Sequence, residues 1–151
     1  MTTSMSTRHQ IKTFPKSARL FLTATIINGI IFSTWQLFFN FFILARGFEK
    51  DFLGLINSMP SIAGLFLGIL MGMVSDRIGR RPAMLIGLSI STLAMGLQLF
   101  VPFPALMVVI AFMGGEGNSL YFISQAPFMM KVTNQHNRSL MFSLNFGLST
   151  L

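Results

Sequence analysis

The sequence of 151 residues contains no cysteine and few charged side chains. Without cysteine, disulfide bonds, thiol redox chemistry and thiolate metal sites are excluded. Charged residues make up 10% of the chain, whereas about 25% is usual for a soluble domain, because its surface must face water. Hydrophobic residues make up 52%. This combination indicates that lipid surrounds much of the folded chain.

Acidic residues are also scarce, with four Asp and Glu against 11 Lys and Arg, and the formal net charge is +7. A nucleic-acid-binding protein would gather its basic residues on one face of a water-soluble unit. Here they lie in short polar intervals between long uncharged runs. We therefore expect a lipid bilayer, and not a nucleic acid, as a partner of this chain.

The sequence shows no pattern typical of an enzyme or a metal site. It has no paired carboxylates, no nucleophile placed beside a base and no glycine-rich phosphate loop. His9 and His136 lie in polar segments without partners at ligand spacing. The sequence therefore predicts no catalytic residue, cofactor or metal ligand, and the protein is expected not to be an enzyme.

Four long runs contain at most one charged residue each, and a shorter fifth run follows. About 20 apolar residues in a helix are enough to cross the hydrocarbon core of a bilayer. We expect transmembrane helices at residues 20–44, 52–74, 83–101 and 105–130, and an incomplete fifth at 140–151. The predicted fold class is an all-α membrane protein, a helical bundle with four complete transmembrane helices and a truncated fifth.

The basic residues are concentrated in alternate polar segments, which must share one side of the membrane because the links between spans are short. The N-terminal tail, the link at 75–82 and the link at 131–139 carry nine of the 11 Lys and Arg. Loops rich in Lys and Arg remain in the cytoplasm. We expect a cytoplasmic tail over residues 1–19, an internal N-terminus and a multi-pass protein of the plasma membrane.

The clearest motif, Gly72-Met73-Val74-Ser75-Asp76-Arg77-Ile78-Gly79-Arg80-Arg81-Pro82, follows the second expected span. It fits the pattern G-x-x-x-D-R-x-G-R-R, and in this the chain resembles the major facilitator superfamily (MFS) of transporters. All the fixed positions are present: Gly72, Asp76, Arg77, Gly79, Arg80 and Arg81. Other pieces look like the same family: Gly47-Phe48, Leu53-Gly54 and Arg138. The resemblance implies that residues 20–151 are part of the N-terminal six-helix bundle of an MFS transporter.

The motif also has a physical interpretation. Gly79 permits a tight turn with positive φ, and Asp76 can pair with Arg77, with Arg80 or with a helix N-terminus. The resemblance implies that Asp76 takes part in a gating contact with the other half of the transporter, whose remaining helices are expected partners. For the arginines, a role in fixing topology is an equal alternative.

Glycines in two expected spans favour close helix packing. Gly64, Gly68 and Gly72 recur at every fourth residue, which is the small-xxx-small pattern of helix pairs in lipid. Gly114 and Gly117 favour the same in the fourth span. We prefer packing to a substrate role for these positions.

Glu116 is the single acid within the expected spans. It lies 12 residues after Pro104, about 18 Å along a helix and near the middle of the bilayer. A charge at that depth costs about 3 kcal/mol or more. We expect Glu116 to bind a proton or a cationic part of a substrate. The alternative is a protonated side chain that is hydrogen-bonded between helices.

Polar side chains in the first and fourth spans are further candidates, because amides do not face lipid without a partner. They line a cavity or form hydrogen bonds between helices; the resemblance favours the cavity for Asn28 and Gln36, and for the fourth span both alternatives stay open. On the fourth span they share a face with Gly114, nearly opposite Glu116. The candidates are Asn28, Gln36, Asn40, Asn118, Tyr121 and Gln125.

These observations favour transport of a small solute by alternating access, by a secondary active transporter of which this chain is an incomplete half. A proton-coupled exporter is one form of it, with protons and an unidentified small molecule as binding partners. Two alternatives stay open: a small four-helix exporter that works as a dimer, and a membrane scaffold or partner subunit that transports nothing.

Overall fold

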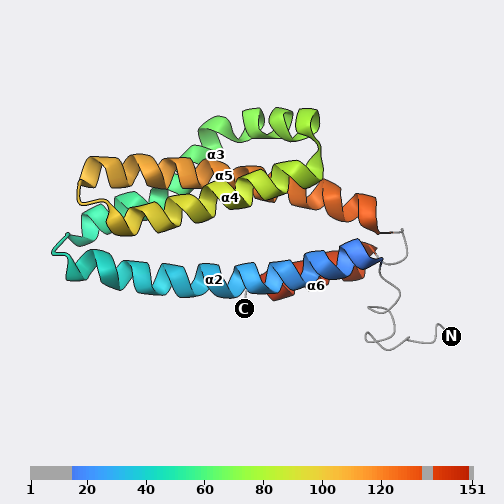
Figure 1. Ribbon diagram of the computed structural model, residues 1–151, viewed down its shortest axis with the longest axis horizontal. Coiled ribbons are helices and arrows are strands. Elements are labelled where there is room, and N and C mark those ends of the chain that lie inside the picture. Colours follow the sequence, from blue (N-terminus) through green and yellow to red (C-terminus); the bar gives the residue numbers. More distant parts are fainter. Residues whose placement is uncertain (1–14, 134–137, 150–151) are drawn as a thin grey trace. The chain divides into compact units, whose positions relative to one another are not determined.

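The computed structural model describes residues 15–133 and 138–149. The regular structure of these residues is entirely helical, which confirms the predicted fold class (Figure 1). Four helices are long and apolar enough to cross a membrane, and α6 is shorter. Their bounds are α2 (Lys16–Ala45), α3 (Lys50–Ile78), α4 (Arg80–Phe100), α5 (Pro104–Val132) and α6 (Arg138–Ser149).

Helices α2 and α3 extend beyond the apolar runs at both ends, so the links that follow them are shorter than the sequence suggested. Only Gly79 separates α3 from α4, where a link over residues 75–82 was expected. The backbone N–H of Gly79 donates to the carbonyl of Ser75 at 3.1 Å, so the helical hydrogen bonding of α3 continues through the motif. Pro82 is compatible with α4 because the first turn of a helix needs no internal N–H donor. Pro104 begins α5 for the same reason.

The chain divides into two compact units. One contains residues 40–128, which are the end of α2 from Asn40, all of α3 and α4, and most of α5. The other contains α2 up to Phe39, the end of α5 from Met129, and α6.

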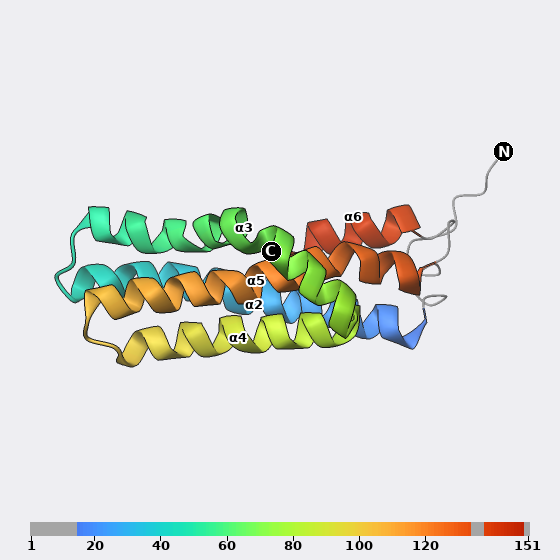
Figure 2. The same ribbon diagram turned by 90° about the horizontal axis from the view of Figure 1, so that it is seen from above.

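In the unit of residues 40–128, α5 packs against both α3 and α4, and α3 crosses over α5 to reach the beginning of α4 (Figure 2). The contact of α4 with α5 is backbone against backbone. A Cβ atom on Gly87 would lie 2.5 Å from the carbonyl oxygen of Gly117, and one on Gly117 would lie 2.6 Å from that of Gly87. Between helices in lipid the hydrophobic effect is weak, so such van der Waals contact is what holds them together.

The contact of α3 with α5 is close at two positions and looser elsewhere. A Cβ on Gly115 would lie 2.5 Å from Cα of Pro60, and one on Gly64 would lie 2.9 Å from Oγ of Ser119. Gly68 and Gly72 also face α5, but a Cβ on either would lie 3.9 Å from Ile123, an ordinary contact distance. The glycine strip of α3 therefore packs on α5, and its tightest point is Gly64.

At the end of this unit away from Gly79, Arg46 joins the link after α2 to the end of α4. Its Nη1 donates to the carbonyl of Val101 at 2.8 Å, and its guanidinium lies 4.8 Å from the ring centre of Phe42. The carbonyls at a helix C-terminus lack partners within the helix and attract cations. Arg46 supplies one such partner to α4.

In the other unit, a buried polar pair joins α2 to α6. Thr25 Oγ1 lies 3.3 Å from Oδ1 of Asn145 and 3.0 Å from the carbonyl of Phe21. The two residues are 3% and 1% exposed. Such a pair satisfies polar groups that could not face lipid.

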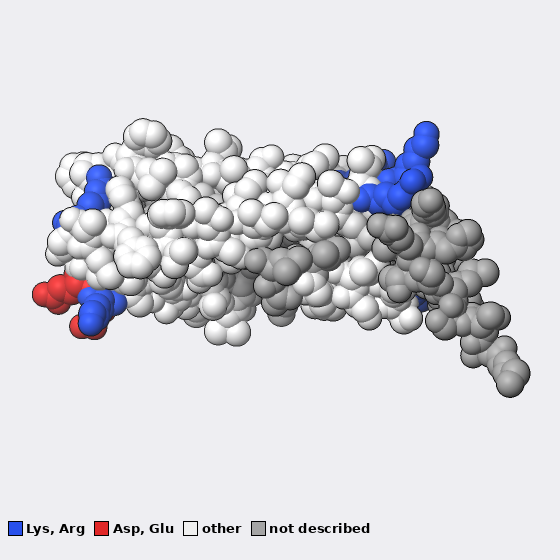
Figure 3. All heavy atoms as spheres, turned by 90° about the horizontal axis from the view of Figure 1, so that it is seen from below, with Lys and Arg blue, Asp and Glu red and all other residues white. Residues whose placement is uncertain are grey.

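The outer faces of the long helices are apolar, and their charges lie at the helix ends. Leu65, Ile69 and Phe100 are 80–82% exposed. On the face shown in Figure 3, Lys, Arg, Asp and Glu side chains occur only at the two ends of the helices. A surface of this kind is stable in contact with hydrocarbon, and the protein is a multi-pass membrane protein.

Candidate functional site

The motif at the α3–α4 junction is built around the conformation of Gly79. This residue has φ 93° and ψ 152°, a conformation that L side chains rarely adopt. A one-residue link must reverse the chain between two long helices, and glycine alone reaches the required φ without steric cost. The turn brings Arg80 back toward the last turn of α3.

Asp76 and Arg80 form an ion pair across this turn through Oδ1 and Nη2. The Asp76 side chain is 63% exposed and that of Arg80 is 30% exposed. Exposed ion pairs contribute about 0–1 kcal/mol to stability. The pair therefore contributes little to holding α3 and α4 together. Arg77 and Arg81 of the same motif are exposed.

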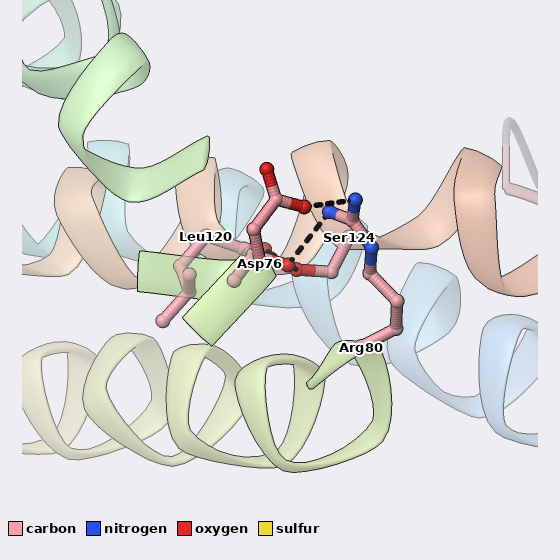
Figure 4. A network of polar contacts seen from close by, with 5 residues as sticks. Asp76, Arg80, Leu120 and Ser124 are labelled. Carbon is pink, nitrogen blue, oxygen red and sulfur yellow. Dashed lines mark hydrogen bonds and ion pairs between the residues drawn. The ribbon is translucent and has the colours of Figure 1, made fainter. Parts of the chain in front are cut away.

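Behind the ion pair lies a buried pair of hydroxyls from two different helices (Figure 4). Ser75 Oγ and Ser124 Oγ are 2.6 Å apart, and both residues are 0% exposed. Arg80 Nη1 donates to Ser75 Oγ at 3.0 Å, and Ser124 Oγ donates to the carbonyl of Leu120 at 2.7 Å. The motif on α3 and α4 is in this way joined to α5.

Sequence reasoning missed both serines. Ser75 occupies a variable position of the motif, and Ser124 lies 49 residues away between the candidates Tyr121 and Gln125. No spacing rule relates residues so far apart. The signal that could have found Ser124 is its place on the same helix face as Tyr121 and Leu120, three and four residues earlier.

Glu116 lies on α5 between the two glycines that make the closest helix contacts. Gly115 packs on α3 and Gly117 packs on α4. Both carboxyl oxygens of Glu116 are buried and have no hydrogen-bond partner in the part of the chain that the structure describes. An unpaired buried carboxylate is costly. Such a group either holds a proton or accepts a cation.

The polar face of α5 that includes Gly114 is largely occupied by helix packing. A Cβ on Gly114 would lie 2.9 Å from Cβ of Ala94, and the backbone nitrogen of Tyr121 lies against Gly87 of α4. Tyr121 and Gln125 are buried, and Asn118 is half-buried.

The polar residues of α2 are divided between the two units. Asn40 accepts a hydrogen bond of 3.1 Å from Nδ2 of Asn57 on α3, which is the helix-to-helix contact that the sequence left open. Asn57 was not among the predicted residues. Asn28 is half-buried and Gln36 is exposed, and both belong to the other unit.

Comparison with known proteins identifies the class. The sequence matches the Major Facilitator Superfamily over residues 17–151, and the chain belongs to this family, as its motif predicted. It is similar to YhjO of Bacillus subtilis (strain 168), an uncharacterized MFS-type transporter, with 32% identity over 90 residues. The aligned segment covers 60% of this chain and 22% of that protein. No solved structure matches the chain significantly.

Proposed function

We propose that this chain is part of a secondary active transporter that moves a small solute across the membrane by alternating access and is coupled to protons. The observation that carries the proposal is Glu116, a half-buried residue of a membrane-spanning helix whose two carboxyl oxygens are buried and have no hydrogen-bond partner among the described residues. Ionisable groups within membrane helices mark ion or substrate pathways by default. Membership of a transporter family supports the same conclusion.

The proposed role of Glu116 follows from the cost of its charge. When the site is closed to water, the carboxyl group is stable only with a proton or with a cationic group of the substrate beside it. When the site opens to one side of the membrane, water stabilises the free carboxylate and the bound species leaves. If the site opens first to one side of the membrane and then to the other, Glu116 takes up the bound species on one side and releases it on the other. The remaining helices of the transporter would form the second wall of this site.

We further propose that half-buried or exposed amides of each unit contact the solute. This residue is Asn118 in the unit of residues 40–128, and in the other unit these residues are Asn28 and Gln36. Asn40 is bonded to Asn57, and Tyr121 and Gln125 are buried. An amide donates and accepts hydrogen bonds, so these residues suit a solute with hydroxyl, amide or amine groups.

The proposed orientation places the N-terminus and the α3–α4 junction in the cytoplasm of the cell whose plasma membrane holds the protein. The absence of cysteine makes this testable with single cysteines that alter no charge. Ile78→Cys places a thiol at the end of α3, just before α4, and Phe103→Cys places one in the link after α4; the native side chains are 41% and 66% exposed. In intact cells a membrane-impermeant maleimide is expected to label Phe103→Cys, and to label Ile78→Cys only after permeabilisation. Labelling of Ile78→Cys from outside would contradict the orientation.

Transport itself is testable in everted membrane vesicles from cells that express the full-length protein. With a respiration-driven pH gradient, we expect a cationic amphipathic solute such as ethidium to be accumulated, and the gradient to fall as it enters. An uncoupler is expected to reduce the accumulation about tenfold, since about 1.4 kcal/mol of gradient corresponds to that ratio. Vesicles without the protein are the control. Uptake that is absent for cations, sugars and neutral drugs alike would contradict the proposal.

A further inference from the structure

A chain of hydrogen bonds with a fixed direction runs from the α3–α4 turn into α5 (Figure 4). Each serine hydroxyl has one proton to donate. Ser124 Oγ donates its proton to the carbonyl of Leu120 at 2.7 Å. The proton in the 2.6 Å contact between the hydroxyls therefore belongs to Ser75, whose oxygen in turn accepts from Nη1 of Arg80 at 3.0 Å. The order is Arg80 to Ser75 to Ser124 to the backbone of Leu120.

The guanidinium of Arg80 is thus held from two sides. Nη1 is directed to the buried hydroxyl pair and Nη2 to the carboxylate of Asp76. The ion pair alone, with Asp76 63% exposed, would leave both side chains free to exchange their contact for water. The buried end of this series of hydrogen bonds is different, because a hydroxyl group that loses its partner there cannot form a hydrogen bond to water instead.

We propose that Ser75 and Ser124 are positioning residues for the motif, because their hydroxyl pair fixes the guanidinium of Arg80 and, through it, the carboxylate of Asp76. Ser124 lies on α5, so the place of the Asp76 charge depends on the packing of α5 against α3. Gly79 links α3 covalently to α4, whereas α5 meets this site through packing and hydrogen bonds.

The same helix carries Glu116, eight residues before Ser124 and about 12 Å along the axis. A shift or rotation of α5 that accompanies a change at Glu116 therefore acts on the hydroxyl pair and releases Arg80. This consequence for transport rests on the proposed function, whereas the positioning of Asp76 does not.

The positioning is testable by carboxyl labelling of the full-length protein in native membranes, with a water-soluble carbodiimide and glycine methyl ester and with mass spectrometry of the peptides. A carboxylate held by a guanidinium reacts slowly, because the reagent must displace its partner. In Ser124→Ala, labelling of Asp76 is expected to be about threefold faster or more, since Ser75 loses the hydrogen bond that holds its hydroxyl in place for Arg80. Ser58→Ala is the matched control, because the Ser58 hydroxyl donates to the carbonyl of Gly54 in its own helix, at 2.7 Å.

Two further measurements keep a structural defect apart from a loss of positioning. Glu49 and Asp51, exposed at the opposite end of the same unit, serve as internal references and are expected to label at the native rate in Ser124→Ala. In an Arg80→Gln background, Ser124→Ala is expected to add nothing to the labelling of Asp76, because the residue through which it acts is gone.

The inference is overturned if Asp76 labels equally fast in the native protein and in Ser124→Ala, or if Glu49 and Asp51 accelerate along with it. It is overturned as well if the effects of Ser124→Ala and Arg80→Gln add. Labelling requires no transported solute, so failure of the transport experiment and failure of this one are distinguishable.

Discussion

Glu116→Gln is expected to slow coupled transport by about tenfold or more and to remove its dependence on pH. The substitution keeps the size and shape of the side chain but replaces one carboxyl oxygen by an NH2 group, which does not titrate. If the carboxyl group carries the proton or holds the cationic group, the amide cannot replace it, and a loss of about 1.4 kcal/mol of binding corresponds to a tenfold change. Uptake by everted vesicles, measured across a range of pH values, checks this.

Glu49→Gln is the matched control, since it makes the same chemical change at an exposed position at the beginning of α3. It is expected to leave the rate and its pH profile unaltered. An unaltered rate and profile in Glu116→Gln would end the proposal that Glu116 binds the coupling ion or the substrate.

Replacing Glu116 by an apolar residue is expected to raise the stability of the protein and to lower its transport activity. Both carboxyl oxygens are buried without a partner among the described residues, and an unsatisfied buried polar group costs about 1–3 kcal/mol. Glu116→Leu removes that cost at similar volume and is therefore expected to raise the midpoint of thermal unfolding in detergent while abolishing coupled transport. Functional groups that are kept at a cost in stability show this pattern.

Gly87→Ala is expected to destabilise the protein strongly, although it adds a single methyl group. The new Cβ would lie 2.5 Å from the carbonyl oxygen of Gly117 and 2.8 Å from the backbone nitrogen of Tyr121. Both are backbone atoms of α5, so α4 and α5 must move apart. Overpacking of this kind costs about 1–3 kcal/mol, and the contact is the main attraction between the two helices in lipid. Thermal unfolding followed by size-exclusion chromatography measures the loss.

Gly96→Ala is the matched control on the same helix. Nothing lies within 4 Å of the Cβ that it would add. Replacing glycine by alanine in a helix stabilises it by about 1 kcal/mol, so this variant is expected to unfold at the same or a higher temperature than the native protein. If both variants unfolded alike, the close contact of α4 with α5 would be contradicted.

The length of the apolar runs and their lack of charged residues were enough to predict an all-α membrane protein with four long helices and a shorter fifth. The reason is that a bilayer imposes one length scale and one polarity on every span, and both are local properties of the sequence. The motif around Gly79 could be recognised in the sequence for a related reason. Its charges, its turn residue and its family resemblance all lie within 11 consecutive residues, Gly72–Pro82.

The partners of individual side chains were decided only by the tertiary structure. Periodicity marked Gly64, Gly68 and Gly72, yet the closest contacts are made by Gly87 with Gly117 and by Gly115 with Pro60. The bond of Asn40 to Asn57 and the pairing of Ser75 with Ser124 likewise join residues of different helices. Such contacts depend on how each helix is rotated about its axis and how far it slides along its neighbour. Those two quantities are set by the packing of all the helices together, and no single segment of the sequence determines them.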